Sequence, residues 1–377
     1  MNVLLIPDAF KDSLSANDVS DAMRRGVLEF NPQSQIFHIP ASDGGEGFLN
    51  SVKHYIDSLA EKECETVDPL GRPIRAGYLY SETTKTAFIE LAKASGLELL
   101  TYAERNPLQT STIGTGIQIR DAMQIGATTI YIGIGGSATN DAGMGIAQAL
   151  GFQFRDAEGN ILNAAGSNLS SVHLVIEPEN NFSNISFFAI NDVLNPLFGP
   201  NGAAFTYAKQ KGASSEDTMK LEQGLRQFSE VIHSELKKDF ANLPGSGAAG
   251  GAAFGLKSFL NAEYISGVSF ILKLARFQKL IFSEKIDVII TGEGCIDQQT
   301  AFGKLVYGVA NEVRDKNIPV LAICGKLNLH PREVKSLGLH KVAQLYHPDQ
   351  EDGYSFTHAT ELIQQRTLDL LKELDLR

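Results

Sequence analysis

Apolar and polar positions in the first 60 residues alternate between two periods. The continuous apolar run from Val3 to Ile6 is typical of a strand buried on both faces. Ser15 opens a capping-box pattern, and apolar residues recur at helical spacing from Val19 to Phe30. The same reasoning predicts a second strand at Ile36 to Ile39 and a second amphipathic helix between Phe48 and Leu59. This part of the chain is therefore predicted to be β-α-β-α.

The last quarter of the chain repeats this alternation. The predicted elements are strands at Val288 to Ile290, Val320 to Ile323 and Val342 to Leu345, with helices at Leu305 to Val313 and after Pro331. Because parallel strands need helical crossovers, both chain ends are expected to build one doubly wound, Rossmann-like α/β domain. Its predicted residues are 1–60 plus 285–377.

The middle of the chain, residues 61–284, has a different pattern and is predicted to be an inserted mixed α/β domain. The predicted elements are short strands within 64–92, a helix at Gly114 to Ile125, a strand at Thr128 to Ile134, a helix at Met144 to Leu150 and a hairpin around Asp156 to Asn160. A two-domain enzyme of this kind is expected to hold its active site in the cleft between the domains.

Length and charge narrow the class of protein. The chain has 377 residues, and at about 150 residues per domain this favours two domains. With 33 Lys and Arg against 44 Asp and Glu, the net charge of −11 disfavours nucleic-acid or anionic-membrane partners. The three cysteines are far apart, and no apolar run is long enough for a signal peptide or membrane span. A cytoplasmic location is therefore expected.

The glycine-rich stretch from Gly133 to Gly143 is the sharpest candidate site, because a strand is predicted to end there and a helix to begin. A helix N-terminus offers free N–H groups to phosphate or carboxylate. The candidate contacts are Gly135, Gly136, Ser137, Thr139, Asn140 and Asp141. Two other interpretations stay open: glycines that only let the helix pack closely, and a dinucleotide fingerprint with Asp156 as its acid, which the predicted hairpin disfavours.

Carboxylates and lysines follow several of the other predicted strands. Asp8 and Lys11 follow the first strand, where ligands of α/β proteins usually bind, although a surface ion pair would look the same. Asp43 and Glu46, three residues apart in DGGEG, suit metal or substrate contact, with a helix cap as the alternative.

Two further strand ends carry acidic residues. Asp192 follows the apolar run ending at Ile190 and is a candidate base or a turn-forming residue. Glu293, Asp297 and Lys304 follow the strand near 290 and suit a metal–phosphate site, although the sequence has no Walker motif.

Six motifs occur in a fixed order along the chain: PDAFKDSLSA, SDGGEG, GIGGSATNDAGMG, NDVLNPLFGPNGAAFTYAKQKGA, PGSGAAGG and TGEGCIDQQTAFGK. Together they resemble the bacterial class I glycerate kinase family over roughly residues 1–330. The resemblance implies ATP- and Mg²⁺-dependent phosphorylation of D-glycerate, at the 2-hydroxyl, to give 2-phosphoglycerate. The sequence departs from the family pattern at Ala9, Asp12, Asn191 and Cys295, and Cys295 stands where the family commonly has arginine.

Roles for the candidate residues follow from this resemblance together with what phosphoryl transfer needs. Asp192 is the expected base, with Asp8 and Lys11 in the catalytic group and Lys11 neutralising phosphate or the glycerate carboxylate. Residues 135–141, Asp43, Glu46 and Lys304 are expected to bind substrate or phosphate, and Glu293 and Asp297 to hold the metal. The competing hypotheses are a hinge-closing binding protein for a small acid, which consumes no ATP, and a dehydrogenase.

Overall fold

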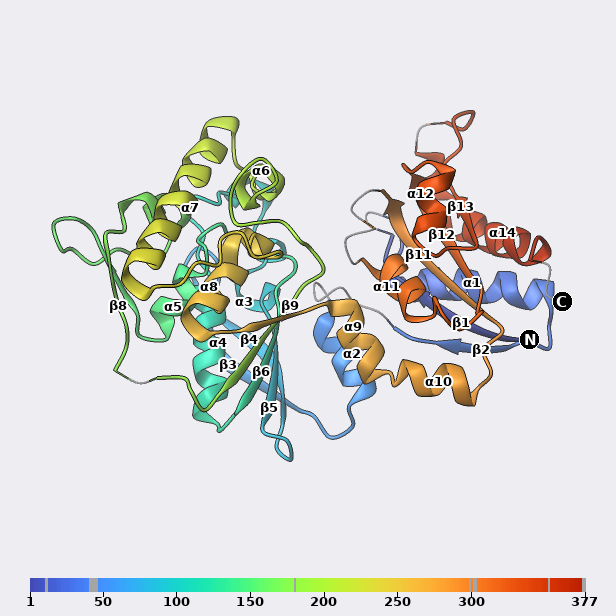
Figure 1. Cartoon of the computed structure of the whole chain (residues 1–377), viewed down its shortest axis with the longest axis horizontal. Helices are drawn as coiled ribbons and strands as arrows, with labels where there is room; N and C mark the ends of the chain where they lie inside the picture. Colours follow the sequence, from blue (N-terminus) through green and yellow to red (C-terminus); the bar gives the residue numbers. More distant parts are fainter. Residues whose placement is uncertain are drawn as a thin grey trace. The chain divides into compact units, whose positions relative to one another are not determined.

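The computed structural model describes residues 1–10, 13–40, 47–179, 181–297, 300, 304–351 and 353–374. The chain divides into two compact units (Figure 1). The first, called the terminal unit, comprises residues 1–43 and 268–377, and the second, called the middle unit, comprises residues 44–267.

These boundaries differ from the predicted ones at 60 and 285. Helix α2 (Phe48–Tyr55) packs on strands of the middle unit, which assigns it there. At the other boundary Val268 packs against Gly308, where an added Cβ would lie 2.6 Å from the valine side chain, so this segment joins the terminal unit. Sequence periodicity finds the elements but not the partners on which they pack.

The terminal unit contains one parallel sheet. Its strands are β1 (Asn2–Pro7), β2 (Gln35–His38), β11 (Val288–Ile296), β12 (Val320–Leu327) and β13 (Lys341–Gln344). Within the described residues their order is β13-β12-β11-β1-β2, and every neighbouring pair is parallel. Strand β1 lies between β11 and β2, so the two chain ends form one sheet and the predicted doubly wound α/β class is confirmed.

Helices cover this sheet because its strands are apolar on both faces. They are α1 (Ala16–Phe30), α9 (Gly267–Leu274), α10 (Phe277–Ser283), α11 (Leu305–Glu312), α12 (Pro331–Ser336), α13 (Tyr354–Thr357) and α14 (Ala359–Lys372). Helix α1 begins at the predicted capping box, with Ser15 accepting from the Asp18 N–H. It lies beside α14 (Figure 1), where Val19, Val27 and Ile363 join one buried core with Val3 and Leu5 of β1.

The middle unit is built on a mixed sheet. Its strands are β3 (Ala60–Val67), β4 (Pro73–Ser81), β5 (Thr86–Glu90), β6 (Thr129–Gly133), β9 (Ser186–Ile190) and β10 (Glu263–Ile265). Their order is β10-β9-β6-β5-β4-β3, in which β10, β9, β6 and β5 pair in parallel and β4 pairs antiparallel with both β5 and β3. A separate pair, β7 (Gln153–Arg155) and β8 (Leu174–Ile176), is antiparallel.

The core of the middle unit lies between this sheet and its helices. These are α2 and α3 (Ala92–Ser95), α4 (Ile113–Gln124), α5 (Met144–Ala149), α6 (Ala203–Tyr207), α7 (Ser215–Leu236) and α8 (Ala252–Leu260). Four rings form its centre, with Phe154 5.7 Å from both Phe228 and Phe259 and Phe228 6.4 Å from Phe254. Such edge-on and tilted contacts are favourable for aromatic pairs.

The segment after β7 settles one of the alternative interpretations of the glycine stretch. Asp156 accepts hydrogen bonds from the N–H groups of Glu158 and Asn160, and Arg155 bridges to Ile161 in an antiparallel sense. The predicted hairpin is confirmed, and Asp156 does not end a parallel strand as a dinucleotide fingerprint requires. None of the helices in the described ranges is both long and apolar enough to cross a bilayer.

Candidate functional site

The candidate residues lie at strand ends, because the carboxyl ends of neighbouring parallel strands meet at one edge of a sheet. In the middle unit this edge carries the glycine stretch after β6, Asp192 after β9 and Ser266 after β10. In the terminal unit the corresponding edge carries Asp8 after β1 and Asp297 after β11. Each unit thus gathers its own set of candidate residues.

Residues 135–141, called the glycine loop from here on, connect β6 to the short helix α5. Gly136 is exposed and Gly135 half-buried, while Ser137 is 5% exposed. The side chains of Thr139, Asn140 and Asp141 are fully buried. Of the six predicted contacts, only those at the start of the loop are therefore open to a ligand in this structure.

The exposed start of the loop pairs with the chain segment that follows α3. The Leu97 N–H donates to the Gly136 carbonyl at 2.9 Å, and the Ala138 N–H donates to the Ser95 carbonyl at 2.9 Å. Gly96 and Ser137 form the antiparallel bridge between these two bonds. The backbone around Gly136 is consequently fixed by a neighbouring strand-like segment.

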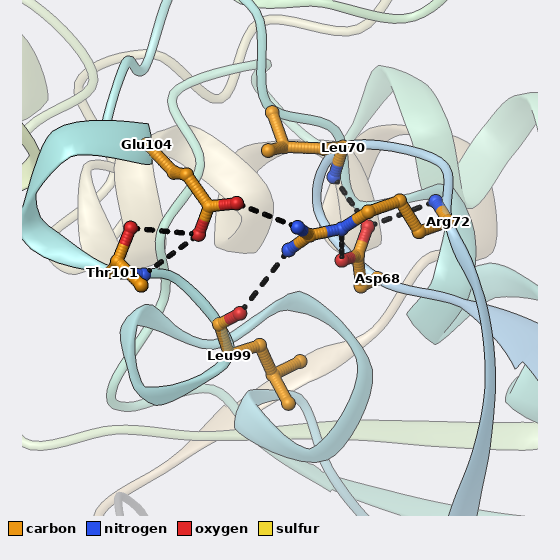
Figure 2. A network of polar contacts seen from close by, with 6 residues as sticks. All are labelled: Asp68, Leu70, Arg72, Leu99, Thr101 and Glu104. Carbon is orange, nitrogen blue, oxygen red and sulfur yellow. Dashed lines mark hydrogen bonds and ion pairs between the residues drawn. The ribbon is translucent and has the colours of Figure 1, made fainter.

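That segment is in turn fixed by a polar network around Arg72 (Figure 2). The Arg72 guanidinium forms ion pairs with the buried Asp68 and, at 2.6 Å, with Glu104, and it also donates to the Leu99 carbonyl at 3.4 Å. Glu104 also accepts from the Thr101 N–H and hydroxyl. One arginine therefore joins the β3–β4 turn to residues 99–104, for which its planar group with five donors is well suited.

Asp141 fixes the buried end of the glycine loop. Its carboxylate accepts hydrogen bonds from the Thr112 N–H and hydroxyl, both at 2.8 Å, and from the N–H groups of Gly143 and Gly145, both at 3.2 Å. Burial raises the pKa of this carboxyl, while the four donors favour its ionised form. Asp141 thereby ties the start of α4 to the start of α5 and has a structural role here.

Asp192, the predicted base, lies half-buried after β9. The Ser266 hydroxyl donates to its Oδ1 at 2.7 Å. Asn191, where the sequence departs from the family pattern, uses its side-chain oxygen to accept from the Val193 N–H at 3.2 Å, which forms a local turn. Ser266 was not predicted from the sequence, because a lone serine after a three-residue strand carries no motif.

Glu90 is a second residue that sequence reasoning missed. It ends β5, is fully buried, and accepts a hydrogen bond from the Leu49 N–H at 3.2 Å, which satisfies the first turn of α2. Burial raises the pKa of its carboxyl. Its position at the end of a predicted strand could have identified Glu90 from the sequence, because the strand ends of this sheet carry polar residues.

The terminal unit brings three predicted residues together. Glu293, near the end of β11, is 5% exposed and accepts from the Thr300 hydroxyl, and the Thr300 hydroxyl also accepts from the Asp297 N–H at 3.1 Å. The Lys304 ammonium lies 3.6 Å from the Asp297 carboxylate. Burial raises the pKa of Glu293 to about 7, and the charges of Asp8 and Asp297 act in the same direction. Asp8, Glu293, Asp297 and Lys304, called the acidic cluster below, are close enough to interact electrostatically.

The donor set of this cluster fits Mg²⁺, which prefers carboxylate oxygens and is usually held by one or two of them together with phosphate oxygens. Protein groups alone do not complete a metal site, since no three His, Cys, Asp or Glu side chains among the described residues are arranged to hold a metal. Cys295 lies beside the cluster and accepts from the Asn328 side chain at 3.4 Å.

Lys11, Asp43 and Glu46 lie outside the described residues. Helix α2 begins at Phe48, with Gly47 at its N-cap position.

Comparison with known proteins adds the evolutionary context. A sequence profile described as the glycerate kinase family matches residues 3–374. The chain is 40% identical to the glycerate kinase of Halalkalibacterium halodurans over 87% of this chain and 86% of that protein, and 40% identical to the glycerate 2-kinase of Escherichia coli over the same shares. A crystal structure from Salmonella typhimurium LT2 with the provisional name glycerate kinase 2 superposes with a TM-score of 0.76 at 34% identity, covering 99% of this chain and 98% of that one. The resemblance seen in the six motifs is confirmed, and the chain belongs to the glycerate kinase family.

Proposed function

We propose that this protein transfers the γ-phosphoryl group of ATP to the 2-hydroxyl of D-glycerate, giving 2-phosphoglycerate and ADP. The observation that carries the proposal is the acidic cluster at the carboxyl ends of β1 and β11, in a chain of the glycerate kinase family. Phosphoryl transfer depends on positioning and charge neutralisation, which carboxylates, a lysine and a metal ion supply.

In this proposal Asp192 accepts the proton of the attacking hydroxyl. Two observations support it: the side chain is half-buried, and Ser266 orients one oxygen by donating to it at 2.7 Å. Asp8 and Lys11 complete the catalytic group.

Substrate binding is proposed for the start of the glycine loop, where Gly136 is exposed, Gly135 half-buried and Ser137 buried beside them, together with Asp43, Glu46 and Lys304. Thr139, Asn140 and Asp141, at the other end of the same loop, are completely buried and are proposed to hold it in place. A backbone held by Ser95 and Leu97 presents its polar groups without a large entropic cost on binding.

Glu293 and Asp297 are the residues proposed to hold Mg²⁺ together with ATP phosphate oxygens. When bound, the ion would neutralise charge on the transferring phosphoryl group. Lys304, which lies beside Asp297, supplies a second positive charge at the same place. The three free cysteines support a proposed location in the reducing cytoplasm.

The test is to incubate the purified protein with ATP, Mg²⁺ and D-glycerate, to follow ADP release, and to identify the product by phosphorus NMR. Glycerate-dependent ADP release with 2-phosphoglycerate supports the proposal, and 3-phosphoglycerate would change the acceptor hydroxyl. ADP release that is independent of glycerate, from folded protein, would contradict it.

The role of Asp192 is tested separately. Asp192→Asn should lower kcat by about 10²- to 10⁴-fold, the usual contribution of a general base. Asp156→Asn, at the hairpin tip, is the matched control and should keep full activity. Full turnover by Asp192→Asn would remove this residue as the base.

A further inference from the structure

Lys211 is a buried lysine beneath the glycine loop. It ends the 3₁₀ helix Lys209–Lys211 and is 2% exposed, whereas Lys209 at the other end of the same turn is exposed. The Lys211 ammonium donates a hydrogen bond of 2.6 Å to the backbone carbonyl of Thr139. Lysine is almost never fully buried without a partner, so this position needs a reason.

The charge that opposes Lys211 belongs to Asp141. Among the described residues, Asp141 is the charged group whose field acts on the lysine, and burial lowers the pKa of Lys211 to about 7. The other charged group nearby, Arg105, packs its backbone against Gly212, while its guanidinium lies 5.8 Å from the ring centre of Tyr102. Lys211 and Asp141 are therefore two buried ionisable groups that interact electrostatically, and Lys211 also donates to the Thr139 carbonyl.

Asn140, next to Thr139, adds no side-chain hydrogen bond at this point. Both polar atoms of the Asn140 side chain are buried and have no hydrogen-bond partner within the described chain. Gly250 packs against the Thr139 carbonyl from another direction but donates nothing to it. Two buried side chains donate to the backbone between Ser137 and Asp141: the Thr110 hydroxyl, to the Ala138 carbonyl at 2.9 Å, and the Lys211 ammonium, which is the charged donor of the two.

We propose that Lys211 is a positioning residue for the reaction: its positive charge, and not only its bulk, holds the glycine loop in the conformation that binds substrate. The proposal rests on the proposed function of the loop. The charged form donates a stronger hydrogen bond to the Thr139 carbonyl than the neutral amine does, and it is also attracted by the charge of Asp141. Substrate affinity should therefore fall as the pH rises through neutrality, where the lysine loses its proton.

The experiment measures kcat and the KM for glycerate and for ATP from about pH 6 to about pH 9 in the wild type, Lys211→Met, Lys211→Arg and the control Lys209→Met. In the wild type and in Lys209→Met, KM for at least one substrate should rise over this range. In Lys211→Met the KM at low pH should be raised about 10- to 100-fold, because a hydrogen bond from a charged group is lost. This KM should then change little with pH, because methionine does not titrate. Lys211→Arg keeps its charge at every pH, so its KM should stay flat.

A readout that does not need activity separates this proposal from the proposed function. Hydrogen exchange of the backbone amides of residues 137–145, corrected for the intrinsic pH dependence, should be faster in Lys211→Met and unchanged in Lys209→Met. Should Lys211→Met not fold, Lys211→Gln replaces it, since glutamine can donate to the Thr139 carbonyl but carries no charge.

The outcomes are distinct. A wild type that does not phosphorylate glycerate contradicts the proposed function, and hydrogen exchange then still reports on the loop. An unchanged KM and unchanged exchange in folded Lys211→Met would overturn the positioning role. A Lys211→Arg variant with the pH profile of the wild type would overturn the role of the lysine charge.

Discussion

Gly250 lies so close to the glycine loop that there is no room for a side chain at this position. Its φ of +67° is rarely adopted by other residues, and an added Cβ would lie 2.0 Å from the Thr139 carbonyl oxygen. Gly250→Ala combines backbone strain with a backbone clash, so we expect it to lower the free energy of unfolding by about 3 kcal/mol or more. Urea denaturation measures this change.

Gly71 provides the matched control for Gly250. It has a φ of +83°, but an added Cβ would meet nothing within 4 Å. Gly71→Ala therefore has strain without a clash, and its expected cost is about 1 kcal/mol. Equal costs for the two variants would show that the close contact at Thr139 is not important for stability.

Glu293 makes stability depend on pH. Its pKa is raised from 4.5 to about 7 in the folded state, so the folded protein binds more protons than the unfolded chain between these values. The contribution of Glu293 to stability is therefore present below about pH 4.5 and is lost as the pH rises to about 7, a change of about 3 kcal/mol. Glu293→Gln removes this dependence.

The measurement compares urea unfolding of the wild type and Glu293→Gln in magnesium-free buffer at about pH 5 and about pH 8. The glutamine variant should gain about 2–3 kcal/mol relative to the wild type at the higher pH. Parallel changes in the two proteins would mean that the folded-state pKa of Glu293 is close to its ordinary value.

At the scale of single residues, the sequence indicated which side chains are unusual but not whether they are buried or exposed. Thr139, Asn140 and Asp141 stood out as a polar run in a glycine stretch, yet all three side chains are fully buried. Their burial depends on the segments around Ser95 and Gly250, which lie far away along the chain. Local patterns carry no information about such contacts.

Helix α7 illustrates stabilisation at the scale of an element. Ser214 is its N-cap and accepts from the Asp217 N–H at 3.1 Å, while Asp217 accepts from the Ser214 N–H at 3.0 Å. Ser214→Ala should lower the free energy of unfolding by about 1 kcal/mol, because an orphan N–H loses its acceptor. Ser215→Ala, one residue inside the helix, should be neutral, and thermal melting of both variants checks the difference.

Elements with strong periodicity were predicted well, and their ends less well. Strands β1, β11 and β12 lie where continuous apolar runs predicted them. Helix α2 ends at Tyr55, although apolar residues at helical spacing continue to Leu59. The Ile56 backbone is extended, and β3 begins at Ala60. The chain therefore leaves the helix in order to enter the sheet, although the apolar pattern of the helix continues.

At the scale of the whole molecule, the middle unit has a complete core and sheet of its own. Residues 44–267 contain all strands from β3 to β10 and the aromatic cluster around Phe228. We expect a fragment of residues 44–267 to fold and to unfold cooperatively by circular dichroism. The fragment 1–43 should remain unfolded, because β1 pairs with β11 on one side. A fragment 44–267 without a cooperative transition would contradict this prediction.

The position of β1 also sets an order of events during synthesis. Strand β1 leaves the ribosome first, but its partner β11 begins only at Val288. At about 5–20 residues per second, the intervening chain takes on the order of ten seconds to a minute to be made. During that time the apolar residues of β1 lack their partner β11, and exposed apolar chain is what attracts other chains and chaperones. The nascent protein should therefore depend most on chaperone protection while its middle unit is already complete.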